Sequence, residues 1–443
     1  MELRDLIVTP IVIILVYVAA YLIRPRVTDA VNRKYFFPAL SLRIFGALAL
    51  GFLYQFYYHG GDTFNYHTHG SRHIWEAFMD SPVLGWKLLT SGGEPIKGAY
   101  AYTSSVIFYT DPSSFFVVRI AALFDLFTFS SYAATAVLFA VVSFLGAWSL
   151  FFAFYRESPQ HHPWIAIATL FIPSVIFWGS GLLKDTLTLA AIGFLTLAVS
   201  NFFRFDRKKS FSVMLLILSV WILYSIKKYI LLCFLPAAIL WIYASYLARI
   251  KSLILKVLIV PVIFALLVGS GYYSIILIGK DDPKYSLDRI ATTAQVTAYD
   301  IGFYTGKDAG SGYSLGELDG TFGNMMSKAP QAINVSLFRP YLWEVKNPLM
   351  LLTAMESVLL LVATLVIIMR YSSSLIYSFR NPTVLFCLVF SFSFAFAVGV
   401  STFNFGTLAR YKIPLLPFYV LALGYIYYNS NNKRKSEALA LTE

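Results

Sequence analysis

Charged residues are scarce in this sequence. Only 13% of the 443 residues are charged, whereas 58% are hydrophobic and 17% are aromatic. Soluble domains typically carry about 25% charged residues, and several runs here reach the ~20 apolar residues that cross a bilayer as a helix. The short alternating segments of a membrane β-barrel are absent. The composition therefore predicts an all-α, polytopic transmembrane helical bundle and excludes an ordinary soluble protein.

Cysteine and acidic residues are also few. Cys233 and Cys387 both lie in apolar runs and form neither a disulfide framework nor a metal motif. The 35 Lys and Arg outnumber the 23 Asp and Glu, which gives a net charge of +12. No nucleic-acid-binding motif accompanies this excess, so we expect no nucleic-acid partner and assign the excess to loops near anionic membrane lipid.

No cleavable signal peptide is expected, because the first apolar run follows Glu2 and Asp5 rather than a basic stretch. No internal repeat or low-complexity segment marks a second domain. Residues 1–443 are therefore predicted to form a single transmembrane domain.

The apolar runs, oriented by the positive-inside rule, predict about 11 spans. They cover residues 6–22, 37–57, 132–155, 164–178, 182–202, 211–226, 229–247, 252–278, 348–369, 382–401 and 408–428. Two large extracytoplasmic loops, 58–131 and 279–347, then lie outside, and the first should contain interfacial helices. Segment 115–129 is apolar but short and contains Arg119 and Asp125, so we expect an interfacial helix there; a membrane crossing is the alternative.

The most polar stretch, residues 57–73, follows the second apolar run directly and holds four of the six histidines. Asp62 follows two glycines in this stretch. A carboxylate at a membrane–water boundary can act as a general base on an acceptor hydroxyl or bind a metal. Asp111, which precedes Pro112, is a second acidic candidate, and its alternative role is to begin a turn.

The histidines leave the cofactor open. Their spacing matches no familiar zinc motif, and histidines at an interface are commonly only solvated or hydrogen-bonded. If a metal binds, His59 and His67 are its candidate ligands, and the metal could equally be Mg²⁺, Mn²⁺ or zinc.

Basic residues recur where the predicted topology places the outer face. Lys227, Lys228 and Arg410 oppose the positive-inside trend, and an anionic group such as a lipid phosphate would explain them. The alternative for the two lysines is that the flanking spans are misassigned.

Two further charged pairs each allow a functional and a structural interpretation. Lys184 lies next to Asp185 at the start of an apolar run, either as a local ion pair or as the lining of a polar cavity. Arg339 could hold an anion, or it could pair structurally with Glu344 within an aromatic belt.

An acidic residue in the first external loop, interfacial helices and a many-span bundle together resemble the GT-C membrane glycosyltransferases. These include the protein O-mannosyltransferase and aminoarabinose-transferase families. Arg410, Tyr411, Pro414 and Pro417 also match the Arg-Tyr-x-x-Pro-x-x-Pro pattern common near the end of such proteins. The resemblance implies a polyprenyl-phosphate sugar donor, a single inverting displacement, and a loop acid, here Asp62, that is the catalytic base or a metal ligand.

The sequence also departs from that family. Asp62 follows the second apolar run rather than the first, and Thr63 stands where the family commonly has a glutamate. No large soluble C-terminal domain is present. These differences bear on metal dependence and on the type of acceptor.

The resulting prediction is an inverting GT-C-like glycosyltransferase of the bacterial plasma (inner) membrane, with its active site facing the outside or periplasm. The predicted catalytic residues are Asp62 and Asp111, and the predicted substrate-binding residues are Lys184, Lys227, Lys228, Arg339, Glu344, Arg410 and Tyr411. The expected partners are membrane lipids, the polyprenyl-phosphate sugar, and a glycan, lipid or protein acceptor.

Three alternatives remain. A polymerase or ligase of lipid-linked glycans would also present external arginines. A transporter or flippase of an anionic lipid-linked substrate would show inverted repeats and broken helices. A non-catalytic scaffold would leave the outward basic residues unexplained.

Overall fold

The computed structural model describes residues 2–205, 209–249, 275–303 and 311–440, with a few isolated positions between 261 and 273. This described part is helical and contains no strand; one isolated bridge pairs Gly312 with Asn404. The chain divides into two compact units, and the prediction of a single transmembrane domain stays a prediction. The first unit comprises Met1–Phe202 and Arg207–Lys227, and the second comprises Phe203–Asp206 and Lys228–Glu443.

Eight helices in the described residues are long and apolar enough to cross a membrane, which indicates a multi-pass α-helical membrane protein. The prediction of about 11 spans is therefore met only in part. Five of the helices begin in the first unit: α1 (Leu3–Val27), α2 (Arg33–Phe56), α8 (Tyr132–Tyr155), α11 (Lys184–Val199, extended by η3, Ser200–Arg204) and α12 (Lys209–Ile226). The other three lie in the second unit: α13 (Lys228–Arg249), α18 (Pro348–Ser378) and α19 (Pro382–Thr402).

Proline divides two of the predicted spans. Segment 164–178 forms α9 (His162–Leu170) and α10 (Pro173–Trp178), because the residue before a proline is disfavoured in helical conformation. Segment 408–428 is divided around Pro414 into α20 (Phe405–Tyr411) and α21 (Leu416–Ala440). Most of the predicted span 252–278 lies outside the described residues.

The break after α10 is held by a buried arginine. Arg43 of α2 is 1% exposed, and its Nη1 donates to the carbonyl oxygen of Val175 at 2.7 Å and to Ser143 Oγ at 3.1 Å. A longer contact of 3.4 Å reaches the carbonyl oxygen of Gly179. A cation at the carboxyl end of a helix is electrostatically favourable. Arg43 therefore stabilises the end of α10, where the Val175 carbonyl also accepts a hydrogen bond from the Gly179 amide at 3.2 Å.

Helices α8 and α11 approach each other through glycines, as small residues allow in membrane bundles. A Cβ on Gly193 would lie 2.0 Å from the carbonyl oxygen of Gly146, and one on Gly146 would lie 2.2 Å from Ala190 Cα. These contacts involve backbone atoms, so a side chain cannot be accommodated by a rotamer change.

We expect Gly193→Ala to lower the stability of the first unit. The added methyl group would push the two packed helices apart. Such overpacking typically lowers the free energy of unfolding by about 1–3 kcal/mol. The thermal unfolding midpoint of protein in lipid nanodiscs measures this effect. Gly323→Ala is the matched control, because a Cβ at Gly323 meets nothing within 4 Å; equal midpoints for the two variants would contradict the close crossing.

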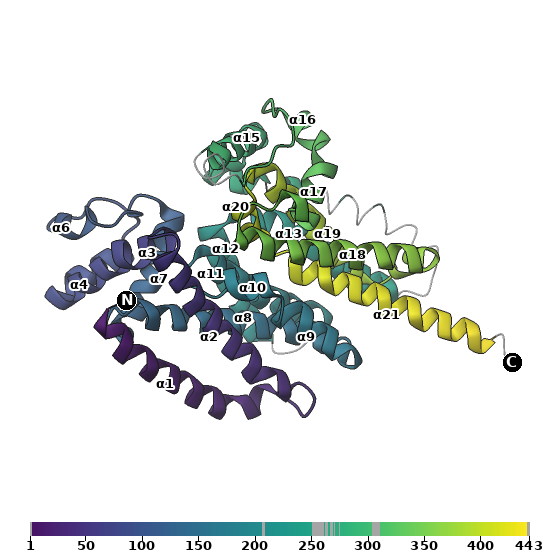
Figure 1. The fold of residues 1–443 in the computed structure, drawn as a ribbon, viewed down its shortest axis with the longest axis horizontal. Coiled ribbons are helices and arrows are strands. Elements are labelled where there is room, and N and C mark those ends of the chain that lie inside the picture. The colour runs from purple at the N-terminus through teal and green to yellow at the C-terminus, as the bar shows by residue number, and fades with distance from the viewer. Residues whose placement is uncertain are drawn as a thin grey trace. The chain divides into compact units, whose positions relative to one another are not determined.

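In the second unit, aromatic side chains pack around α19. Phe386 stacks on Trp241 of α13 with ring centroids 4.4 Å apart, and Phe390 lies 4.7 Å from Phe418 of α21. Helices α18 and α21 run side by side in this unit (Figure 1). The described part of this unit also contains the shorter helices α15 (Ile290–Ile301), α16 (Phe322–Ser327) and α17 (Ala329–Phe338).

The predicted first external loop is a set of short helices within the first unit. They are α3 (Asp62–Tyr66), η1 (His67–Ser71, a π-helical turn), α4 (Arg72–Asp80), α5 (Pro82–Thr90), α6 (Tyr100–Thr103) and α7 (Pro112–Thr128). Helix α7 contains the segment predicted to lie at the membrane interface, yet Phe115, Val117, Val118 and Ala121 are at most 1% exposed. One face of α7 is therefore part of the core of the unit, while Phe127 on the same helix is 75% exposed; further exposed apolar residues lie on α4 and α5.

Met79, Val83 and Trp86 are each at least 58% exposed and recur along α4 and α5 at helical spacing. Helix α5 is held against α4 at Gly85, where a Cβ would collide with the Phe78 ring at 2.3 Å.

The start of α1, a predicted span, is adjacent to α4 (Figure 1): the Arg4 guanidinium lies 5.9 Å from the Trp75 ring centroid. Because α1 is a predicted span, this contact leads us to expect that the exposed apolar residues of α4 and α5 lie near the membrane interface.

We expect spin labels at Val83→Cys and Trp86→Cys to be immersed in lipid. In liposomes, power saturation should show that these labels are more accessible to oxygen than to a water-soluble nickel chelate. The reason is that apolar and tryptophan side chains partition to the membrane interface. The exposed Lys97→Cys should report the aqueous phase, and the native Cys233 and Cys387 are buried. Equal nickel accessibility at positions 83, 86 and 97 would refute membrane contact.

Candidate functional site

A tight turn places Asp62 beyond the end of α2. His59, Gly60 and Gly61 all have positive φ, at 54°, 138° and 115°, a region that glycine adopts without strain. The Gly60 amide donates to the carbonyl oxygen of Tyr54 at 2.9 Å, which fixes the turn against α2. Asp62 is then the first residue of α3 and remains partly exposed.

Asp111 is the N-cap of α7. Its carboxylate accepts hydrogen bonds from the Ser113 amide at 3.2 Å and the Ser114 amide at 3.3 Å, so the expected turn-forming role is confirmed. It also lies 3.4 Å from Lys184 Nζ, which donates to Ser113 Oγ at 2.7 Å.

Lys184 also lies within electrostatic reach of Asp62. Three residues singled out from distant parts of the sequence therefore form one group, the Asp62–Asp111–Lys184 cluster. In this cluster the Lys184 ammonium is paired with the capping carboxylate of Asp111, and Asp62 is a weaker electrostatic neighbour.

The environment of Asp111 keeps it ionised. Burial raises the pKa of this carboxyl, but hydrogen bonds from Ser114 and Ser113 and the charge of Lys184 outweigh that effect and lower the pKa below its usual value. A group with a depressed folded-state pKa contributes stability above its unfolded pKa and loses it as the pH falls through the folded pKa.

We therefore expect Asp111→Asn to reduce the acid sensitivity of the first unit. Asparagine still caps a helix but does not titrate, so the difference in thermal midpoint between wild type and variant should shrink as the pH falls below 4. A difference that stays constant from pH 7 to pH 3 would contradict the ionic role of Asp111.

Lys184 and Asp185 each bond to a partner elsewhere in the chain, because adjacent helical residues do not face each other. Asp185 is fully buried and accepts an ion-pair hydrogen bond from Lys227, which is 8% exposed. The buried carboxylate accounts for this lysine. This ion pair favours a structural role for Lys227 in the first unit over the predicted contact with a lipid phosphate.

In the second unit, Lys228 also has carboxylate partners. Its Nζ lies 3.0 Å from Asp281 and 3.4 Å from Asp282, two residues at the start of the second predicted loop. The structure therefore favours an ion-pairing role for Lys228 over the predicted binding of a phosphate.

Arg339 and Glu344 form the structural pair that the sequence analysis left as the alternative. Arg339 Nε donates to Glu344 Oε2 at 3.0 Å, and a second bond from Nη2 makes the contact bidentate. The guanidinium lies 5.2 Å from the Phe405 ring and 6.0 Å from the Tyr313 ring. Hydrogen bonding to Glu344 raises the pKa of Arg339, so this arginine would have to leave a carboxylate to hold an anion.

The Arg-Tyr-x-x-Pro motif reaches the same region through Lys412. This lysine is 1% exposed, and its Nζ donates to Ser357 Oγ at 3.1 Å and to the carbonyl oxygen of Arg339 at 3.4 Å. Arg410 and Tyr411 are partly exposed on α20, with the guanidinium 5.9 Å from the Tyr411 ring. Their role in substrate binding remains a prediction.

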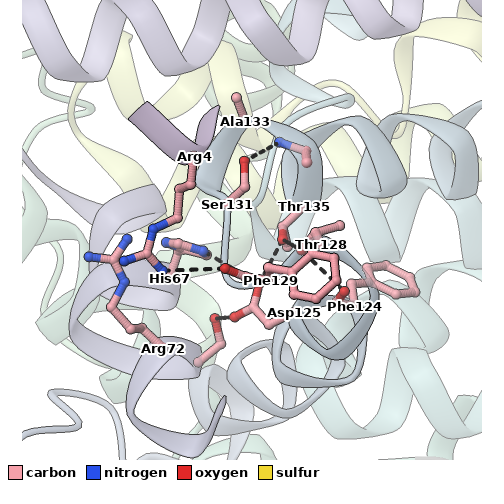
Figure 2. A network of polar contacts seen from close by, with 12 residues as sticks. Arg4, His67, Arg72, Phe124, Asp125, Thr128, Phe129, Ser131, Ala133 and Thr135 are labelled. Atoms are coloured by element: carbon pink, nitrogen blue, oxygen red, sulfur yellow. Dashed lines mark hydrogen bonds and ion pairs between the residues drawn. The ribbon is translucent and has the colours of Figure 1, made fainter. Parts of the chain in front are cut away.

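The histidine-rich stretch is anchored by a buried polar network (Figure 2). His67 Nε2 lies 3.4 Å from Asp125 Oδ1, and both side chains are fully buried. Asp125 accepts hydrogen bonds from Ser71 Oγ and Thr135 Oγ1, each at 2.6 Å. Arg4 donates to the nearby Phe129 carbonyl oxygen at 3.3 Å. The bonds from Ser71 and Thr135 to Asp125 join η1, α7 and α8, and Arg4 links α1 to the end of α7. His67 is buried beside Asp125, but neither of its ring nitrogens has a hydrogen-bond partner among the described residues.

A metal site at the histidines gains no support. Within the described residues no group of three or more His, Cys, Asp or Glu could hold a metal ion. His67 is fully buried beside Asp125, while His59 lines a shallow surface depression. The metal-ligand prediction for His59 and His67 is therefore not carried forward.

Arg43 and Asp125 are buried charges to which the sequence assigned no role. Arg43 lies in the middle of an apolar run, and Asp125 lies in a segment interpreted as interfacial. A charge inside an apolar helix is costly unless it has partners, and that cost was the signal for both. Their partners, two backbone carbonyls for Arg43 and hydroxyls from α8 and η1 for Asp125, come from distant segments and have no sequence pattern.

Comparison with known proteins finds no matching family model, no matching curated protein and no matching solved structure.

Proposed function

We propose that this membrane protein is an inverting glycosyltransferase that uses a polyprenyl-phosphate-linked sugar as donor. The observation that supports this best is the Asp62–Asp111–Lys184 cluster. It combines a partly exposed carboxylate with an ammonium that a second carboxylate holds in place. This pairing supplies a base for an acceptor hydroxyl and a cation for a leaving phosphate.

The proposed reaction is a single displacement. Asp62 accepts the proton of the acceptor hydroxyl, whose oxygen forms a bond to the anomeric carbon. The bond from that carbon to the phosphate oxygen breaks, and its electron pair leaves with the polyprenyl phosphate. Lys184 stabilises the negative charge that develops there, and Asp111 positions Lys184.

The setting follows from the predicted topology. The loop containing Asp62 lies on the extracytoplasmic side of a bacterial plasma membrane, with a glycan, lipid or protein as acceptor. A polymerase or ligase of lipid-linked glycans would use the same donor chemistry, and it would differ by changing the chain length of surface polysaccharide.

A transporter or flippase is the second candidate, and one specific observation favours it. The segment from α9 through α10 to the start of α11 is broken twice, and the buried Arg43 bonds backbone carbonyls at the end of α10. Broken helices with unwound backbone are typical of substrate sites in transporters.

A deletion strain complemented with wild type or with Asp62→Asn tests the proposal. Sugar analysis of envelope lipids, glycans and proteins should show one modification that only the wild-type gene restores. An unchanged envelope composition in the deletion strain would overturn the proposal.

A further inference from the structure

Beside Asp62 lies a depression of about 310 Å³ lined by Gln55, His59, Gly60, Phe64, Thr68 and His69. Its residues come from the end of α2, the glycine turn, α3 and η1, so several elements of the first unit build it. Asp62 is not one of the lining residues, but it lies in the sequence between two of them, Gly60 and Phe64.

The polar groups of this depression are an amide, two imidazoles and a hydroxyl. Each presents a donor, an acceptor or both, which is the set needed to bond several neighbouring hydroxyl groups of one small molecule. None of these side chains is permanently charged, so the depression suits a neutral polyhydroxylated ligand better than a phosphate.

Phe64 supplies the apolar part of the surface. One face of its ring stacks on Tyr132 with centroids 4.6 Å apart and an interplanar angle of 23°. Tyr132 is itself fixed by a 2.8 Å hydrogen bond between its hydroxyl and Thr63 Oγ1. The ring is therefore rigid, and a rigid ring is a platform for the C–H face of a sugar.

Two backbone features shape the depression. Gly60 has a φ of 138°, and a Cβ there would meet no atom within 4 Å, so a ligand can approach the bare turn. Thr68 and His69 belong to the π-helical turn η1, in which His69 departs from helical geometry. Such turns cost stability and occur frequently at functional sites.

We infer that this depression binds the pyranose ring of a sugar substrate. The inference rests on the proposed glycosyltransferase function and names the ligand class at the same site. Gln55, His69 and His59 bond ring hydroxyls, Phe64 packs against the C–H face, and Asp62 stands beside the bound ring.

Saturation-transfer difference NMR tests the subsite with protein in lipid nanodiscs free of sugar detergents. The probes are free glucose, galactose, mannose, N-acetylglucosamine and arabinose, with inorganic phosphate as a competitor. At least one sugar should receive saturation from wild type, and Gln55→Ala/His69→Ala should reduce that transfer at least tenfold. His73→Ala, outside the depression, should leave it unchanged, as should phosphate.

Each outcome decides one claim. Absence of transfer to all five sugars, or equal transfer in the double variant, would overturn the subsite. Loss of sugar signal on adding phosphate would also overturn it, in favour of an anion site. Asp62→Asn should retain sugar binding; if sugars bind but wild type transfers none, the subsite stands and the proposed function fails.

Discussion

Asp62→Asn is expected to abolish sugar transfer while the protein still inserts and folds. Asparagine preserves the size of the side chain but cannot accept the proton of the acceptor hydroxyl. Loss of a general base typically costs about 10²–10⁴-fold in rate. The measurement is the initial rate of label transfer from a lipid-linked sugar by purified protein in liposomes.

Asp80→Asn is the matched control for that experiment. Asp80 is an acid of the same predicted loop and accepts a hydrogen bond from Tyr102, away from the cluster. Its variant should transfer at the wild-type rate. If Asp62→Asn keeps more than a tenth of wild-type activity, Asp62 is not the base.

Asp185→Ala should be among the most destabilising substitutions in the first unit. It leaves Lys227 buried without its carboxylate, and breaking a buried ion pair costs about 3–5 kcal/mol. Thermal unfolding in nanodiscs should show a markedly lower midpoint than wild type.

The double variant Asp185→Leu/Lys227→Met separates a structural pair from a substrate-binding one. Replacing both partners with apolar residues of similar volume is often neutral or stabilising, so the double variant should recover the wild-type midpoint. Because Lys227 is structural, it should also recover sugar transfer. A double variant that is stable but inactive would instead indicate that Lys227 binds the phosphate of the substrate.

The helical fold was predictable because membrane spans depend on length and composition. Segment 132–155 was predicted with the bounds that α8 has, since an apolar run between polar turns has only one way to cross a bilayer. Segments 164–178 and 408–428 were less predictable. Their mean hydropathy suits a span, yet Pro173 and Pro414 end the helices.

The charged residues were predictable as candidates but not as partners. A lysine at the start of an apolar helix is conspicuous in sequence, whereas the position of Asp111 beside Lys184 depends on how α7 packs near α11. The surroundings of His67 were equally hard to predict. A stretch with four histidines suggests a metal site, and nothing in its spacing indicates that His67 lies buried beside Asp125. Contacts between segments that are distant in the sequence determine these roles, and the spacing of residues along the chain does not predict such contacts.

The fate of the lipid-linked donor tests the central claim most directly. Wild-type protein in liposomes is supplied with a doubly labelled polyprenyl-phosphate sugar and a crude envelope acceptor fraction. The account predicts stoichiometric release of polyprenyl phosphate, with the sugar attached to acceptor in inverted configuration. Donor that crosses the bilayer with its sugar–phosphate bond intact would contradict it and identify a transporter.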